Sequence, residues 1–367
     1  MPVGVIVEIL RRLPVKSVVK CKSVCKSWNT LISHPSFIST HLQASLSNNT
    51  PFLLLSYREM GKKDYFFHYD KDGFDEFKQL QFPAFVCASD SLVLGSCNGL
   101  ICLQFWPGDV SRFLLCNPSI RKYISLPWPR ISNDVRINFG FGFDSGTNDY
   151  KLVIIGIGKE DTWIKPFLFS LNENCWKRVN AIPPNYTFDS SELSGSVPFV
   201  NGAVHWIGYQ KRNNGRFTNA ILGFDLSAEE FTEISLPESL IGLGPMNLFT
   251  MKYGESSIAV LKRDRANGLW DLDELWVMKE YGVVGSWTKV LTLTLHRKWF
   301  PNVLGLRKNG EVLVQLDYGK MASLDLNFQQ MELHGVEVTT KLISLEGSYV
   351  ESLVLLDKTV DVHCVSL

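Results

Sequence analysis

The sequence predicts a small all-α segment of three helices followed by an all-β propeller of about six blades. Helical spacing of apolar residues is confined to residues 1–42 of the 367-residue chain. From residue 51 onward, short runs of β-branched and aromatic residues alternate with turn dipeptides such as Asn98-Gly99 and Asn201-Gly202, which supply the positive φ angles that hairpins require. Within that region a short motif recurs about every 50 residues, a period typical of propeller blades.

The helical segment divides into three short helices at its prolines. Pro14 and the pair His34-Pro35 interrupt the helical pattern, because proline cannot donate a backbone hydrogen bond and disfavours a helical conformation in the residue before it. Three helices in about 40 residues bury too little apolar area to be stable alone. They are therefore expected either to pack on the rest of the chain or to present an apolar surface to a partner.

The recurring motif defines the blades of the expected all-β domain, residues 51–367. Each copy begins with a large apolar residue, and most copies end at a proline. The copies are residues 77–83, 123–127, 176–183, 231–237 and 287–293, with a degenerate sixth at 331–336. A blade buries its faces only against neighbouring blades, so the ring must close. The strand-like tail, residues 339–365, could complete the first blade, and the small polar residues 43–50 predict a linker to the helices.

The first 42 residues closely resemble the F-box of plant F-box proteins. The matching positions are Pro2, residues 8–10, 12–17, 24–28 and 31–33, Pro35 and Phe37. The resemblance implies docking to a Skp-type adaptor, which tethers the chain to a cullin–RING ubiquitin ligase. The expected adaptor-binding face consists of Pro2, Ile6, Ile9, Leu10, Leu13, Pro14, Val18 and Trp28. Met1 stands where the family usually has a leucine and several further residues, which would weaken that docking.

The all-β region resembles the F-box-associated domain of plant proteins, a kelch-like propeller. Residues 96–103, 116–123, 139–153 and 201–206 carry this resemblance, although the paired glycines of true kelch blades are missing. The family includes the S-locus F-box proteins of pollen, and residues 174–184 are similar to their corresponding stretch. The resemblance therefore permits a role in pollen self-incompatibility, in which the target is a secreted ribonuclease, without singling it out.

Charge and composition narrow the partners. Residues 1–45 hold six basic residues against Glu8 alone, a net charge of +5 in a chain that is neutral overall. Such a cap would be steered toward an acidic adaptor surface, although a solvated helix face is the simpler interpretation. No aromatic-basic pattern indicates nucleic acid, and no apolar run is long enough to span a membrane. The eight cysteines lack Cys-x-x-Cys spacing, which favours reduced thiols in the cytoplasm or nucleus.

The sequence contains no catalytic constellation, and we expect a non-catalytic protein without cofactors or metals. Gly140, Gly142 and Gly146 lack the spacing and the strand–turn–helix context of a dinucleotide fingerprint. No two histidines have the spacing of metal ligands, and His205 is expected to be structural. Aspartates such as Asp144 stand beside turns, where a carboxylate accepts hydrogen bonds from backbone amides.

Three loops unlike the repeat are the candidates for target binding, because a propeller binds with the loops on its faces. They expose aromatic and basic residues, which are enriched among binding hot spots. The candidates are Trp128 and Arg130, Tyr186 and Phe188, and Lys211, Arg212 and Arg216.

Three functions remain open at this stage. The first is the substrate-recognition subunit of an SCF (Skp–cullin–F-box) ubiquitin ligase, in which the chain needs no nucleophile because it acts by proximity. The second is a propeller that binds a protein or glycan without assembling into a ligase. The third is a propeller enzyme, which would require converging acidic or metal-binding residues at the centre of the ring.

Overall fold

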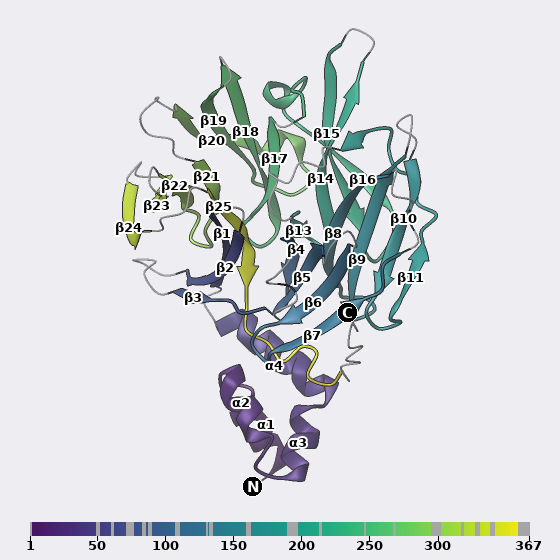
Figure 1. Ribbon diagram of the computed structural model, residues 1–367, viewed down its shortest axis with the longest axis vertical. Coiled ribbons are helices and arrows are strands. Elements are labelled where there is room, and N and C mark those ends of the chain that lie inside the picture. Colours follow the sequence, from purple (N-terminus) through teal and green to yellow (C-terminus); the bar gives the residue numbers. More distant parts are fainter. Residues whose placement is uncertain are drawn as a thin grey trace.

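A computed structural model of the protein describes residues 2–48, 52–59, 62–70, 77–82, 86, 90–106, 111–129, 131, 135–158, 163–188, 197–212, 215–245, 247–266, 269–294, 302–316, 319–326, 331–337 and 342–358. In this part of the chain, four α-helices stand at one end of a ring of six β-sheets (Figure 1). The predicted order, a helical segment followed by a propeller of about six blades, is confirmed.

Prolines set where the helices begin. Pro2 precedes α1 (Val3–Leu10) and Pro14 precedes α2 (Val15–Cys21), positions at which the fixed φ of proline is compatible and its missing N–H is not needed. The third helix, α3 (Lys26–Ile32), follows an extended Cys25. Pro35 is the first residue of α4 (Pro35–Asn48), a position that proline favours.

The prediction of three helices and of a linker over residues 43–50 is wrong for residues 43–48, because α4 continues to Asn48. Its buried face includes Leu42, Ala44 and Ser45, and His41 Nε2 donates to the carbonyl of Leu13 at 2.9 Å. Tertiary packing of this face outweighs the polar composition that predicted a linker.

Each sheet of the ring contains four strands in sequence order, with two exceptions. In blade 4, both β12 and β13 pair with β14, and in blade 1 the inner strand is β25, from the end of the chain. Blade 1 consists of β25 (Leu342–Tyr349), β1 (Phe52–Glu59), β2 (Lys62–Tyr69) and β3 (Phe77–Gln79). Blade 2 consists of β4 (Asp90–Cys97), β5 (Leu100–Trp106), β6 (Arg112–Asn117) and β7 (Lys122–Leu126). Blade 3 consists of β8 (Arg136–Asp144), β9 (Asp149–Ile157), β10 (Trp163–Ser170) and β11 (Cys175–Arg178). Blade 4 consists of β12 (Thr187–Phe188), β13 (Phe199–Val200), β14 (Ala203–Lys211), β15 (Phe217–Asp225) and β16 (Phe231–Ser235). Blade 5 consists of β17 (Leu248–Tyr253), β18 (Ser257–Ala266), β19 (Leu269–Met278) and β20 (Trp287–Thr294). Blade 6 consists of β21 (Asn302–Leu306), β22 (Val312–Gln315), β23 (Lys320–Leu324) and β24 (Met331–Glu337).

The recurring sequence motif is the outermost strand of every blade, namely β3, β7, β11, β16, β20 and β24. The predicted closure of the ring by the tail is confirmed, because β25 pairs with β1 from Phe52↔Tyr349 to Arg58↔Leu342. The predicted turn at Asn98-Gly99 is also confirmed: these two residues connect β4 and β5, and their φ angles are 51° and 81°.

The two ends of the ring differ because strands alternate in direction within a blade. The turns β4–β5, β6–β7 and β8–β9 lie at the end that carries the helices, here called the helical end. The hairpin β14–β15 and the connections that follow β7 and β11 lie at the opposite, far end (Figure 1). The described residues of all three loops predicted to bind a target therefore lie at the far end.

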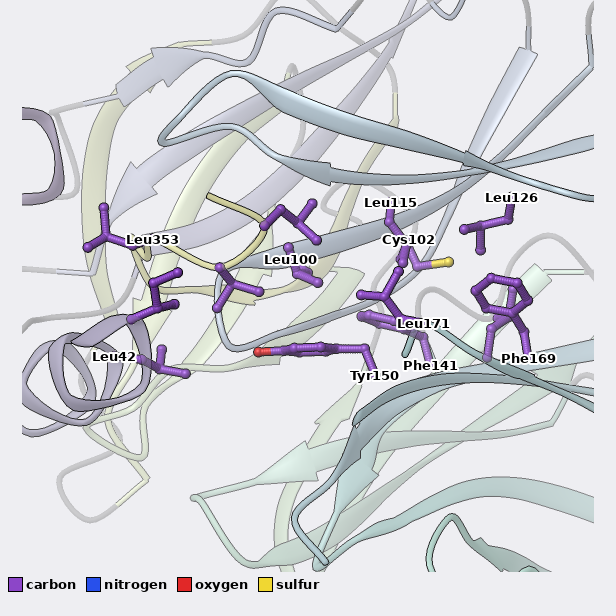
Figure 2. Packing of buried hydrophobic residues seen from close by; sticks show 14 of the residues in the cluster. Leu42, Leu100, Cys102, Leu115, Leu126, Phe141, Tyr150, Phe169, Leu171 and Leu353 are labelled. Carbon is purple, nitrogen blue, oxygen red and sulfur yellow. The ribbon is translucent and has the colours of Figure 1, made fainter. Parts of the chain in front are cut away.

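One apolar cluster joins the helices to the ring. Figure 2 shows Leu42 of α4 and Leu353, from the segment after β25, at one end of this cluster, with Leu100 and Tyr150 of the blades beside them. The cluster extends through blades 2 and 3 to Phe169. Burial of so much apolar surface between helices and blades makes the two parts one packed unit.

Candidate functional surfaces

The helices expose apolar side chains that the rest of the chain leaves uncovered. Val3 is 66 % exposed and Val24 63 % exposed, and Val5 and Ile9 are about half exposed. We call these four residues the helical surface. Sequence reasoning missed Val3, Val5 and Val24. For the two valines of α1 the signal was present, because residues 3–10 are apolar on more than the one face that the core can bury.

The residues predicted to bind the adaptor divide into three environments. Pro2, Ile9 and Pro14 are exposed, and Ile6, Leu13 and Trp28 are half-buried against the shared apolar cluster. Leu10 and Val18 are 1 % and 0 % exposed. Their prediction as contact residues needs correction, because in this chain they support the helices from beneath.

Charges around the helical surface are partly paired. Glu8 accepts hydrogen bonds from Arg11 and from Arg12, and the bond from Arg11 is the largest cause that lowers the pKa of Glu8 to about 2. Lys16 and Lys20 are exposed on α2. The helices therefore combine an apolar surface with an excess of positive charge.

At the far end, two of the predicted aromatic residues are parts of the core. Trp128 is half-buried and stacks on Phe113, with ring centroids 4.8 Å apart. Phe188 is 5 % exposed and packs edge-on against Trp163 and Trp206. The prediction of target contact is corrected for Phe188, because β12 directs its ring into the interface between blades. Target contact by the half-buried Trp128 stays a prediction.

The remaining predicted residues, except Arg130, which lies outside the described residues, come together around the β14–β15 hairpin. Lys211, Arg212 and Arg216 are exposed, and the backbone N–H of Arg212 donates to the carbonyl of Arg216 at 2.8 Å. Tyr186 lies beside them, since β12 pairs with β14 from Thr187↔Tyr209 onward. We call Tyr186, Lys211, Arg212 and Arg216 the hairpin cluster.

Contacts within the hairpin cluster fix two of its side chains. The Nε of Arg212 donates to Thr218 Oγ1, and the hydroxyl of Tyr186 donates to Glu233 Oε1 at 2.9 Å. Burial, followed by this bond to Glu233, raises the pKa of Tyr186 to about 12. At neutral pH the cluster is therefore a neutral phenol beside three cations, with Glu233 as the adjacent carboxylate.

Comparison with protein families decides what this architecture is. The F-box domain family matches residues 1–40, and the family described as "F-box associated beta propeller domain" matches residues 53–324. The chain is an F-box protein of this family.

Curated F-box proteins resemble it over most of their length. F-box protein CPR1 of Arabidopsis thaliana is 28 % identical over 383 aligned residues, which cover 97 % of this chain and 87 % of that protein. F-box/kelch-repeat protein At3g23880 of the same plant is 27 % identical over 308 residues, which cover 80 % and 79 %. Both parts of the architecture are thus shared with plant F-box proteins.

A cavity of about 580 Å³ in this F-box protein is lined largely by the inner strands of the propeller. Asp70 and Glu255 are carboxylates of its lining, and both are ion-paired: Asp70 with Arg307 at 2.7 Å and Glu255 with Lys252 at 2.9 Å. Both basic partners, Arg307 and Lys252, belong to the same lining.

Metal sites and membrane-spanning helices are absent from the described residues. No group of three or more His, Cys, Asp or Glu side chains is placed there to hold a metal ion. Within the same residues, no helix has the length and apolar character needed to cross a membrane. His205 is fully buried, and its Nε2 lies 2.7 Å from the hydroxyl of Tyr281, as expected of a structural histidine.

Proposed function

We propose that this F-box protein is the substrate-recognition subunit of an SCF ubiquitin ligase. The observation that carries the proposal is the placement of two dissimilar surfaces at opposite ends of one packed unit. An apolar helical surface at one end suits a Skp-type adaptor, and a charged hairpin cluster at the far end suits a target protein. The cullin–RING core would be joined indirectly, through the adaptor.

Adaptor docking is assigned to the helical surface together with Pro2, Pro14 and the half-buried Ile6, Leu13 and Trp28. Covering exposed valine and isoleucine side chains removes apolar area from water, which is favourable by about 25 cal/mol per Å². Exposed lysines around this area would steer it toward an acidic adaptor and raise the rate of encounter.

Ubiquitin transfer in such a complex requires no reacting group from this chain. A bound target is held near the charged conjugating enzyme, so its lysines react at a raised effective concentration. The ion-paired carboxylates of the central cavity are compatible with this non-catalytic role.

Target binding is assigned to the hairpin cluster. Two narrower forms of the proposal differ in the target: an unidentified cellular protein, or a secreted ribonuclease as in the S-locus F-box proteins of pollen. The proposal places the chain in the cytoplasm or nucleus. The free thiols of Cys21, Cys25, Cys97, Cys102, Cys116 and Cys175 are compatible with a reducing compartment.

Adaptor capture tests the proposal. The double variant Ile9→Asp, Val24→Asp places two carboxylates on the helical surface, and we expect at least about tenfold weaker binding to a purified Skp-type adaptor. Because both side chains are exposed, the free energy of unfolding should change by less than about 1 kcal/mol.

The matched control carries the same substitutions at exposed isoleucines of the propeller, Ile182→Asp with Ile241→Asp. It should bind the adaptor like the wild type. Equal recovery of all three proteins would contradict the proposed function. Absence of a cullin from material co-purified from cells would favour a propeller that binds its partner outside a ligase.

A further inference from the structure

The chain does not end with the strand that closes the ring. After β25, residues 350–358 run back across the helical end, between α4 and blade 2 (Figure 1). Ser352 and Leu353 are 0 % exposed and Leu355 is 1 % exposed, although this segment belongs to no sheet. Such complete burial outside regular structure requires dedicated hydrogen-bond partners.

Asn117, the last residue of β6, supplies the first set of partners. It is fully buried, and its Nδ2 donates to the carbonyls of Ser352 at 3.0 Å and Val354 at 2.7 Å. Its Oδ1 accepts from the backbone N–H of Ser119 at 3.0 Å and from the hydroxyl of Tyr349 at 3.2 Å. Every hydrogen-bonding group of this side-chain amide is used, and half of them hold residues 350–358.

Lys122, the first residue of β7, supplies the second set. The segment ends in a turn in which the N–H of Leu356 donates to the carbonyl of Leu353. The carbonyls beyond this turn point toward Lys122, whose Nζ donates to those of Leu355 at 3.2 Å, Leu356 at 3.1 Å and Lys358 at 2.8 Å. A cation at this position holds three carbonyls at the end of the segment, as cations do at a helix C-terminus, and the carbonyl of Leu355 also accepts from the N–H of Lys358.

The apolar side of the same segment touches the helices. Leu353, Val354 and Leu355 belong to the shared cluster that also contains Phe37 and Leu42 of α4, and Figure 2 shows Leu42 and Leu353 near one another. The turn between β4 and β5 lies beneath this segment and leaves room for it only because it contains a glycine. A Cβ at Gly99 would lie 2.2 Å from Ser352 Oγ. One face of residues 350–358 is thus fixed to blade 2, and the other supports α4.

We infer that Asn117 and Lys122 are positioning residues, which hold residues 350–358 as a strap that fixes the F-box at one orientation on the propeller. In Figure 1, α1, α2 and α3 lie beyond α4, away from the blades. The position of α4 against the blades therefore sets their orientation. The consequence for ubiquitin transfer, a constant geometry between adaptor and target, rests on the proposed function. The attachment of the F-box to the propeller by the strap does not depend on that function.

Hydrogen exchange of the full-length chain tests whether Asn117 and Lys122 hold the strap and, through it, α4. In Asn117→Ala, and more mildly in Lys122→Met, amides of residues 35–48 and 350–358 should exchange at least about tenfold faster than in the wild type, while residues 217–245 keep their rates. The matched control is Asn219→Ala. Asn219 is equally buried in blade 4, where its Nδ2 donates to the carbonyl of Leu240 at 2.7 Å, and its loss should accelerate exchange only there.

A distance measurement separates positioning from a general loss of stability. Cys25 on the F-box and Cys175 on blade 3 are both exposed and can carry spin labels, after Cys21, Cys87, Cys97 and Cys364 are replaced by serine. We expect one narrow distance distribution in the wild type and in Asn219→Ala, and a distribution at least about twice as broad in Asn117→Ala.

Two outcomes would overturn the inference: an unchanged distance distribution in Asn117→Ala, or equal acceleration of α4 exchange in Asn117→Ala and Asn219→Ala. Neither measurement involves the adaptor. A wild-type chain that binds no adaptor but shows the expected loosening would therefore defeat the proposed function and leave the strap standing.

Discussion

Phe188 and Lys211 lie on neighbouring strands of blade 4, but their environments are opposite. The register pairs Phe188 with Gly208, so its ring enters the interface between blades 3 and 4 and packs between Trp163 and Trp206. Three residues further along β14, Lys211 is exposed at the hairpin. At the far end, position along the strand decides whether a large side chain packs or is available to a partner.

In the helices, too, the position of a residue decides whether it packs or is exposed, even for two consecutive residues. Leu10 is in the shared apolar cluster, whereas Ile9 is about half exposed. Helical periodicity offers both residues as contact candidates, but the chain itself covers one of them. A surface that binds a partner must be built from what the fold leaves uncovered.

The largest expected effect tests this contrast in blade 4. Phe188→Ala removes a ring that touches two tryptophans, and the cavity and lost contacts should lower the free energy of unfolding by about 3–5 kcal/mol. Urea denaturation measures this change. Lys211→Ala, on the adjacent strand, should change it by less than about 0.5 kcal/mol.

A Phe188→Ala variant as stable as the wild type would mean that the ring is not part of the interface between blades. In that case Phe188 would return to the set of candidate target contacts, and position along the strand would not distinguish it from Lys211.

A smaller effect concerns His205, which is buried on β14 one residue before Trp206. Burial lowers the pKa of His205 to about 4, against about 6.5 in an unfolded chain. Below pH 6.5 the unfolded chain gains a proton that the folded chain does not bind, so stability falls as the pH falls toward 4. Between pH 7 and pH 5 this single group should lower the free energy of unfolding by about 2 kcal/mol.

Denaturation at the two pH values checks this expectation, with His205→Gln as the comparison. Glutamine can retain a hydrogen bond to Tyr281 but does not titrate, so the variant should lose less stability on acidification than the wild type. Burial also lowers the pKa of His41, so some pH dependence should remain. Identical slopes for the wild type and the variant would exclude His205 as a cause.

Much of the fold could be predicted because its signals are local. The outer-strand motif repeats a chemical pattern in every blade, and Pro14 ends one helical pattern where another begins. The end of α4 was missed because the packing that stabilises residues 43–48 comes from elsewhere in the chain. The strap was missed for the same reason: Asn117 holds carbonyls more than 200 residues away, and no local pattern reveals that pairing.

The candidate surfaces were predictable only in part. Residue type correctly selected Lys211 and Arg212 as exposed, because charged side chains at a hairpin rarely pack inside. It did not predict that Tyr186, from another loop, lies beside them. It could not separate a Trp128 that stacks on Phe113 from an exposed ring, since aromatic residues serve cores and interfaces alike.

The smallest expected effect on stability sharpens the comparison at the hairpin. The triple variant Lys211→Glu, Arg212→Glu, Arg216→Glu should change the free energy of unfolding by less than about 1 kcal/mol, because these side chains are exposed. If the hairpin cluster binds the target, proteins that accumulate on the wild-type chain after proteasome inhibition should be recovered at least about tenfold less with the variant.

A control with the same change of charge removes the effect of net charge. Arg121→Glu, Lys279→Glu, Lys308→Glu reverses three exposed cations in turns at the helical end, and should recover the same target proteins as the wild type. Equal losses in both triple variants would assign the effect to long-range charge rather than to contact. Undiminished capture by the hairpin variant would place target binding elsewhere on the propeller, and the far-end contrast would then describe packing alone.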